Sequence, residues 1–167
     1  YNVNIELPQN SDEFSFSVAR LWNEVLLFSI RNDLARPTVH ARNLFHTSAA
    51  MYDAWSIVNQ QGSPYLIGNI NNGFESSFSS FSSSENHYEK EINAISYSAY
   101  RLIKHRFLNS PGYNEIINRA NNLMSILGLD INNLNSENYS ENSIALGNYI
   151  AESYIQYGLL DLSLIHI

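Results

Sequence analysis

The chain contains no cysteine, few basic residues and no long apolar run. Without cysteine it can form neither disulfides nor thiolate metal sites, and it can hold no iron–sulfur cluster and no cysteine nucleophile. Nine lysine and arginine residues stand against sixteen acidic ones, for a formal net charge of −7. This balance argues against nucleic acid as a partner. The longest apolar runs, such as residues 25–28, are far shorter than the roughly 20 residues that cross a bilayer, so we expect no membrane partner.

Helical periodicity accounts for most of the chain. Apolar residues recur at spacings of three and four in five stretches, and no stretch of strand length alternates between apolar and polar residues. The pattern predicts helices over about 12–32, 39–59, 85–107, 111–128 and 141–158. The expected caps are Ser11 or Asp12 for the first helix, Asn109 or Ser110 before Pro111 for the fourth, and Ser140 for the fifth. The predicted fold class is therefore all-α, a bundle of about five helices.

A long connection separates the second and third predicted helices. Residues 60–84 are rich in serine, asparagine and glycine, which are turn and loop residues. Residues 65–70 are a candidate for a short extended piece. We expect this segment to be a flexible surface connector rather than part of a site.

One polar stripe runs along the predicted helix at 39–59. Arg42, His46 and Asp53 are separated by four, seven and eleven residues, spacings that return to nearly the same helix face. Alanines at 41, 49, 50 and 54 allow another helix to approach, so we expect the stripe to be partly buried and internally paired. Arg42 and Asp53 lie about 16 Å apart along the axis, so only His46 or another helix could link them. We interpret the stripe as a structural polar network; a direct catalytic role is the alternative.

The chain lacks the motifs of the common helical enzyme sites. It has no Glu-x-x-His pair, no His-Glu-x-x-His zinc helix, no nucleophile elbow and no phosphate-binding glycine loop. His87 and Glu91 are four residues apart and could share a metal, but an exposed pair of this kind is more typical of a solvated surface. His40 points about 120° away from His46, which argues against a shared metal. We therefore assign no catalytic, cofactor-binding or metal-binding residue in this chain.

Several segments nevertheless look familiar. They are Trp22-Asn23-Glu24, Ile30-Arg31-Asn32-Asp33, Arg36-Pro37, Ala41-Arg42-Asn43-Leu44-Phe45-His46, Ala49-Ala50-Met51-Tyr52-Asp53-Ala54-Trp55 and, near the end, Ala145-Leu146-Gly147-Asn148 with Tyr157-Gly158. Together they resemble the N-terminal helical region of bacterial vanadium-dependent haloperoxidase-related proteins, in the superfamily of type 2 phosphatidic acid phosphatases. The resemblance spans about 13–161 and implies a mainly helical oxidoreductase. In such an enzyme vanadate, held by basic residues and one histidine, supports halide oxidation by hydrogen peroxide.

The anion-binding motifs of that family are missing here. The family pattern has Lys-x6-Arg-Pro, then Pro-Ser-Gly-His, then Ser-Arg-x5-His. Lys90 and Lys104 are followed seven positions later by Tyr97 and Pro111, and Ser29 stands where a lysine would precede Arg36-Pro37. No Ser-Gly-His occurs. The resemblance therefore implies that the vanadate cofactor belongs to an intact parent protein. We expect residues 1–161 to be an inactive N-terminal half-domain whose main partner is a missing C-terminal catalytic half.

Two other functions remain open at this stage. The parent could be an acid phosphatase or phosphate-ester hydrolase of the same superfamily, in which the corresponding histidine attacks phosphorus. The chain could instead be a non-enzymatic helical binding module. The resemblance is compatible with a homo-oligomer and with export, although the cellular address is unknown.

The last six residues stand apart from the rest. Residues 162–167 read Leu-Ser-Leu-Ile-His-Ile, which matches the in-frame translation of a transposase mosaic-end adapter. We expect them to be an artefactual tail, so His166 supports no chemical argument. The alternative is an ordinary apolar C-terminal helix or strand end.

Overall fold

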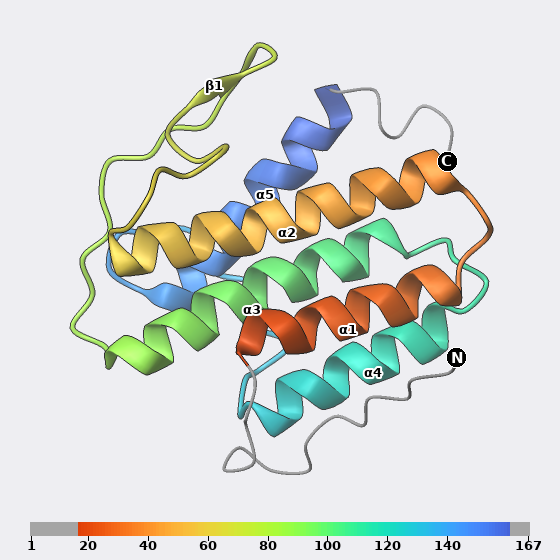
Figure 1. Cartoon of the computed structure of the whole chain (residues 1–167). Helices are drawn as coiled ribbons and strands as arrows, with labels where there is room; N and C mark the ends of the chain where they lie inside the picture. Colours follow the sequence, from red (N-terminus) through yellow and green to blue (C-terminus); the bar gives the residue numbers. More distant parts are fainter. Residues whose placement is uncertain (1–16, 161–167) are drawn as a thin grey trace.

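Five helices account for almost all of the regular structure in residues 17–160, which are the residues that the computed structural model describes. They are α1 (Val18–Arg31), α2 (Pro37–Asn59), α3 (His87–Arg106), α4 (Tyr113–Ile126) and α5 (Ser143–Leu160) (Figure 1). The predicted all-α bundle is confirmed. The 12–16 part of the first predicted helix, its caps Ser11 and Asp12, and the 162–167 tail lie outside the described residues.

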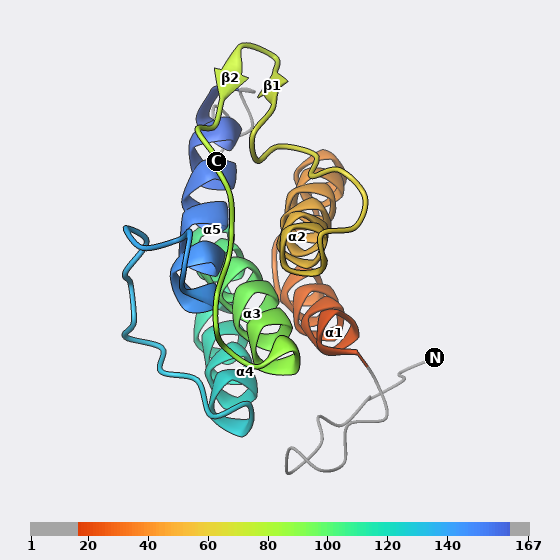
Figure 2. The same cartoon turned by 90° about the vertical axis from the view of Figure 1, so that its left-hand side faces the viewer.

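A small hairpin interrupts the long connection after α2. Strands β1 (Ile70–Asn71) and β2 (Phe74–Glu75) pair antiparallel, and Asn72 and Gly73 between them both have positive φ. This is the backbone geometry that an Asn-Gly turn supplies. Figure 2 shows the hairpin beside the C-terminal end of α5. The sequence pattern predicted no sheet, because two-residue strands are too short to show alternation.

Helix starts differ from the sequence prediction where backbone contacts decide them. α2 begins at Pro37 rather than 39, because proline fits the first helical turn. α4 begins at Tyr113 rather than at Pro111, because the chain before it is held against the end of α1. There the Gly112 amide donates to the Asn32 carbonyl at 3.1 Å, and a Cβ on Gly112 would lie 2.6 Å from that oxygen.

The last helix is shifted toward the C-terminus relative to the prediction. α5 begins at Ser143, where the Asn142 side chain accepts from the Ala145 amide at 2.9 Å. Ser140 is not its cap, since its carbonyl accepts from the Ser82 amide at 2.7 Å instead. The helix continues past Gly158 to Leu160. Among residues 17–160 no helix is long and apolar enough to span a membrane.

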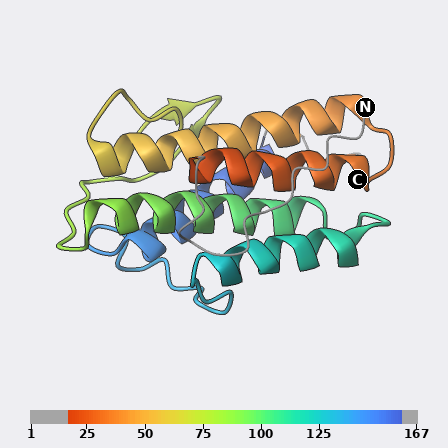
Figure 3. The ribbon, with the colours of Figure 1, turned by 60° about the horizontal axis from the view of Figure 1, so that its bottom comes forward.

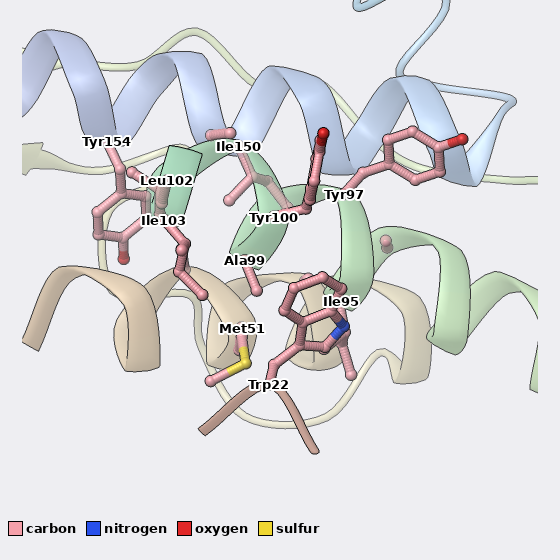
Figure 4. Packing of buried hydrophobic residues seen from close by; sticks show 14 of the residues in the cluster. Trp22, Met51, Ile95, Tyr97, Ala99, Tyr100, Leu102, Ile103, Ile150 and Tyr154 are labelled. Atoms are coloured by element: carbon pink, nitrogen blue, oxygen red, sulfur yellow. The ribbon is translucent and has the colours of Figure 1, made fainter. Parts of the chain in front are cut away.

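Helix α3 is the centre of the bundle, since it packs against all four other helices. α2 and α5 lie on its two sides, and α4 runs alongside α1 and α3 (Figures 2 and 3). Trp22 of α1 is fully buried and donates from its indole nitrogen to Ser96 of α3 at 3.0 Å. Its ring meets Tyr100 edge-on, with centroids 6.2 Å apart (Figure 4). The apolar faces expected from the periodicity therefore converge on α3.

Helices α3 and α5 are in close contact at Gly147. A Cβ there would lie 2.7 Å from the Ala94 carbonyl oxygen and 2.8 Å from the Tyr97 Cβ. Both neighbours belong to α3, and one of them is backbone, so neither can give way cheaply. Only glycine lets the two helices pack this closely.

We expect Gly147→Ala to destabilise the protein by about 1 to 3 kcal/mol, the range for overpacking a tight contact. A decrease in stability would be informative, because alanine inside a helix otherwise stabilises a protein by roughly 0.5 to 1 kcal/mol relative to glycine. Urea unfolding followed by circular dichroism measures the change. Gln156→Ala, at an exposed position of the same helix, is the control and should stay within about 0.5 kcal/mol of the wild type. A Gly147→Ala protein as stable as the wild type would contradict the close approach.

Candidate functional site

Asp53 of α2 is a completely buried carboxylate that accepts four hydrogen bonds. Its Oδ1 accepts from the backbone amide of Tyr65 at 2.5 Å. Its Oδ2 accepts from the amides of Leu66 at 3.0 Å and Ile67 at 3.2 Å, and from the Tyr154 hydroxyl of α5 at 3.0 Å. The carboxylate thus joins α2, the start of the long connection and α5.

Burial shifts the pKa of both Asp53 and Tyr154. Burial raises the pKa of Asp53 above its ordinary value, although the amides and the Tyr154 hydroxyl act in the opposite direction. Burial, and then the adjacent Asp53 carboxylate, raises the pKa of Tyr154 far above that of a free phenol. Tyr154 therefore keeps its proton and serves as a hydrogen-bond donor. Figure 4 shows its side chain extending from α5 toward α2.

His46 is the second buried polar group of the stripe, and its partner lies on α3. The Nη2 of Arg106 contacts Nδ1 of His46, and both side chains are buried. A guanidinium can only donate, so Nδ1 of His46 is the acceptor in this contact. The imidazole also packs against the rings of Tyr154 and Tyr157, with centroids 6.1 and 5.5 Å away. His46 is thereby fixed between α2, α3 and α5.

Arg42 lies at the solvent side of the stripe, in an open hollow of about 680 Å³. Residues of α2, the hairpin turn and the end of α5 line the hollow: Thr38, Ala41, Arg42, Phe45, His46, Asn72, Tyr157 and Leu160. The Asn72 side chain closes one part of the wall by donating to the Tyr157 hydroxyl at 3.1 Å. The hollow therefore combines one guanidinium with neutral polar groups and an apolar rim.

The three predicted stripe residues lie in different settings along one helix face. Asp53 binds the connection and Tyr154, His46 binds Arg106, and Arg42 faces the hollow. Tyr154 links the first two, since its hydroxyl bonds Asp53 and its ring contacts His46. The sequence analysis considered such an intermediary only between Arg42 and Asp53, so the structural polar network of all three residues stays an interpretation.

Sequence reasoning missed the partners of the stripe. These partners are Tyr154 and Arg106, and the arginine near the end of the otherwise apolar face of the predicted helix at 85–107 is the signal that could have revealed a buried polar partner. The connection was expected to be a flexible surface segment. That expectation is wrong for its first part, because Leu66 and Ile67 are buried and their amides bind Asp53. The residue types of 65–67 do not reveal that their backbone amides bind a carboxylate.

The residues that line the hollow do not fit a vanadate site. A trianionic tetrahedral oxide needs several cations and hydrogen-bond donors around it. Among the residues that line the hollow Arg42 is the only arginine or lysine, while Arg106 is engaged behind His46. Arg36, which imitates the family's Arg-Pro motif, instead donates to both Asp33 oxygens at 3.1 and 2.9 Å.

Comparisons with known proteins add no relative. No protein-family model matches the chain, and no curated protein or solved structure is significantly similar to it. The likeness to haloperoxidase-related proteins therefore stays a prediction from the sequence segments quoted above.

We expect Tyr154→Phe to lower the free energy of unfolding by about 1.5 to 3 kcal/mol at neutral pH, because a buried carboxylate loses a hydrogen-bond donor. The hydroxyl favours the ionised form of Asp53, so its loss raises the pKa of Asp53 further. The deficit should therefore be present above the pKa of Asp53 and shrink as the pH falls through it. Urea unfolding over a range of pH values measures this.

Tyr88→Phe is the matched control for that substitution. Tyr88 is 63% exposed on α3, so its replacement should leave the free energy of unfolding unchanged across the whole pH range. A Tyr154→Phe deficit that persists unchanged in acid would show that the hydroxyl acts on something other than the Asp53 carboxylate.

Proposed function

We propose that residues 17–160 are the scaffold of the N-terminal half of a vanadate-dependent haloperoxidase-like enzyme, whose reaction takes place on a part of the protein beyond them. One observation supports this most directly. Two polar groups of the resembling segments are bound within the bundle itself. Asp53 accepts from loop amides and from Tyr154. His46 is bound by Arg106. Groups committed in this way hold helices together and leave little capacity to bind a substrate.

The hollow supplies the place where the catalytic part would dock. Phe45 and Leu160 line it and are 45% and 59% exposed, and Tyr65 meets Phe45 edge-on at 5.2 Å. Large apolar side chains gathered around an open concavity are typical of a surface that another structural element covers. Because Leu160 is the last residue of α5, a chain continuing from this helix starts at the rim of the hollow. We infer that the catalytic half packs here and that Arg42 faces it.

The proposal predicts no turnover from the chain alone. Purified protein supplied with vanadate, bromide and hydrogen peroxide should brominate no acceptor, and it should hydrolyse no p-nitrophenyl phosphate, because the required cations are not assembled. The parent gene, read past the codon of residue 161, should encode the missing cation and histidine motifs. Phosphatase activity of that extended protein, without halide oxidation, would instead assign it to the hydrolase branch. A reading frame without the cationic cluster, or turnover by the chain itself, would overturn the proposal.

The docking role of the hollow predicts a selective effect of Phe45→Asp. The isolated chain should lose no more than about 1.5 kcal/mol of stability, the value of the aromatic pair with Tyr65. The extended enzyme should lose at least about tenfold in activity, because a charge would be buried in the interface. Leu44→Asp is the control, since Leu44 is 37% exposed on the same helix and does not line the hollow. Equal losses of activity for the two variants would contradict docking at this surface.

A further inference from the structure

A second cavity, of about 330 Å³, lies between the first turns of α1 and α3 and the middle of α2. Figure 3 shows the start of α1 beside α2 and α3. The cavity shares no lining residue with the hollow, so it is a separate feature of the bundle. Its volume is within the range of cavities that bind small molecules.

The floor and one wall of this cavity are apolar and aromatic. Met51 and Ile95 form the floor and are 4% and 2% exposed. Tyr52 and Trp55 form the wall, with ring centroids 6.0 Å apart and planes at 31°. The faces of tyrosine and tryptophan rings carry negative potential and attract cations, most strongly those that are weakly hydrated.

Glu91 is the one charged side chain among the residues that line the cavity. Asn59 holds it near the aromatic wall, because Nδ2 of Asn59 donates both to the Trp55 carbonyl at 2.9 Å and to the Glu91 Oε2 at 3.0 Å. Glu91 forms no ion pair with a residue of the described part, 17–160. The carboxylate is half-buried, so its charge acts in a less polar environment than free water.

We propose that this cavity binds a small organic ammonium, a cationic nitrogen that carries methyl or methylene groups. The nitrogen lies against the Trp55 ring and the Glu91 carboxylate, and the aliphatic part rests on Met51 and Ile95. An anion is disfavoured, because no lysine or arginine lines the cavity and Glu91 repels it. A metal ion is disfavoured, because a single carboxylate offers too few ligands. The proposal is independent of the proposed enzyme half, since the two involve different surfaces.

Choline and 3,3-dimethyl-1-butanol test the proposal on the full chain, because they have nearly the same shape and differ in the positive charge. The chain has two tryptophans, so its amide–proton NMR spectrum contains two indole signals. Choline should shift the Trp55 signal saturably and leave that of the fully buried Trp22 in place. The neutral analogue should bind at least about tenfold more weakly.

Glu91→Gln separates charge from shape in the same titration. The amide oxygen of glutamine still accepts from Asn59, so the fold should be retained, as the melting curve checks. Choline binding should weaken at least about tenfold, whereas Glu89→Gln, at an exposed position of α3 outside the cavity, should leave it unchanged. Equal binding of choline and its neutral analogue, unaltered choline affinity in Glu91→Gln, or no shift of the Trp55 signal at 50 mM choline would overturn the proposal.

Discussion

The hydrogen bonds to Asp53 join helix α2 to the start of the long connection and to helix α5. A carboxylate with no exposure to solvent is stable only when its oxygens are fully hydrogen-bonded, and here three consecutive amides and one phenol meet that need. The donors come from parts of the chain far apart in sequence. Burial of Asp53 therefore requires α2, the connection and α5 to be in place together, which makes this group a point of cooperativity in folding.

The hollow and the smaller cavity lie at opposite ends of α3. The hollow with Arg42 is lined by the first turns of α2, the end of α5 and Asn72 of the hairpin turn. At the other end of α3 its first turns meet α1 and the middle of α2, where Glu91 and Trp55 line the smaller cavity. One feature presents a guanidinium and the other a carboxylate, so they suit chemically different partners.

Much of the fold was accessible from residue spacing, while the partners of the polar groups were not. Leu21 and Val25 follow the helical spacing of one predicted helix and Ile95 and Leu102 that of another, and the structure buries all four. The start of α4 was misplaced, because the contact of Gly112 with Asn32 depends on a helix eighty residues earlier. The hairpin and the amides of residues 65–67 were missed for a similar reason, since backbone donors are the same in every residue and only their placement gives them a role.

The sequence by itself determined the class of this protein: amphipathic spacing in five stretches dictates helices, and helices with one apolar face must bury it against each other. It also placed Arg42, His46 and Asp53 on one side of a helix, because the helical repeat fixes that relation locally. Which groups they meet was decided only by the tertiary structure. Hydrogen-bond partners separated by tens of residues depend on how whole helices pack, and no local period records that.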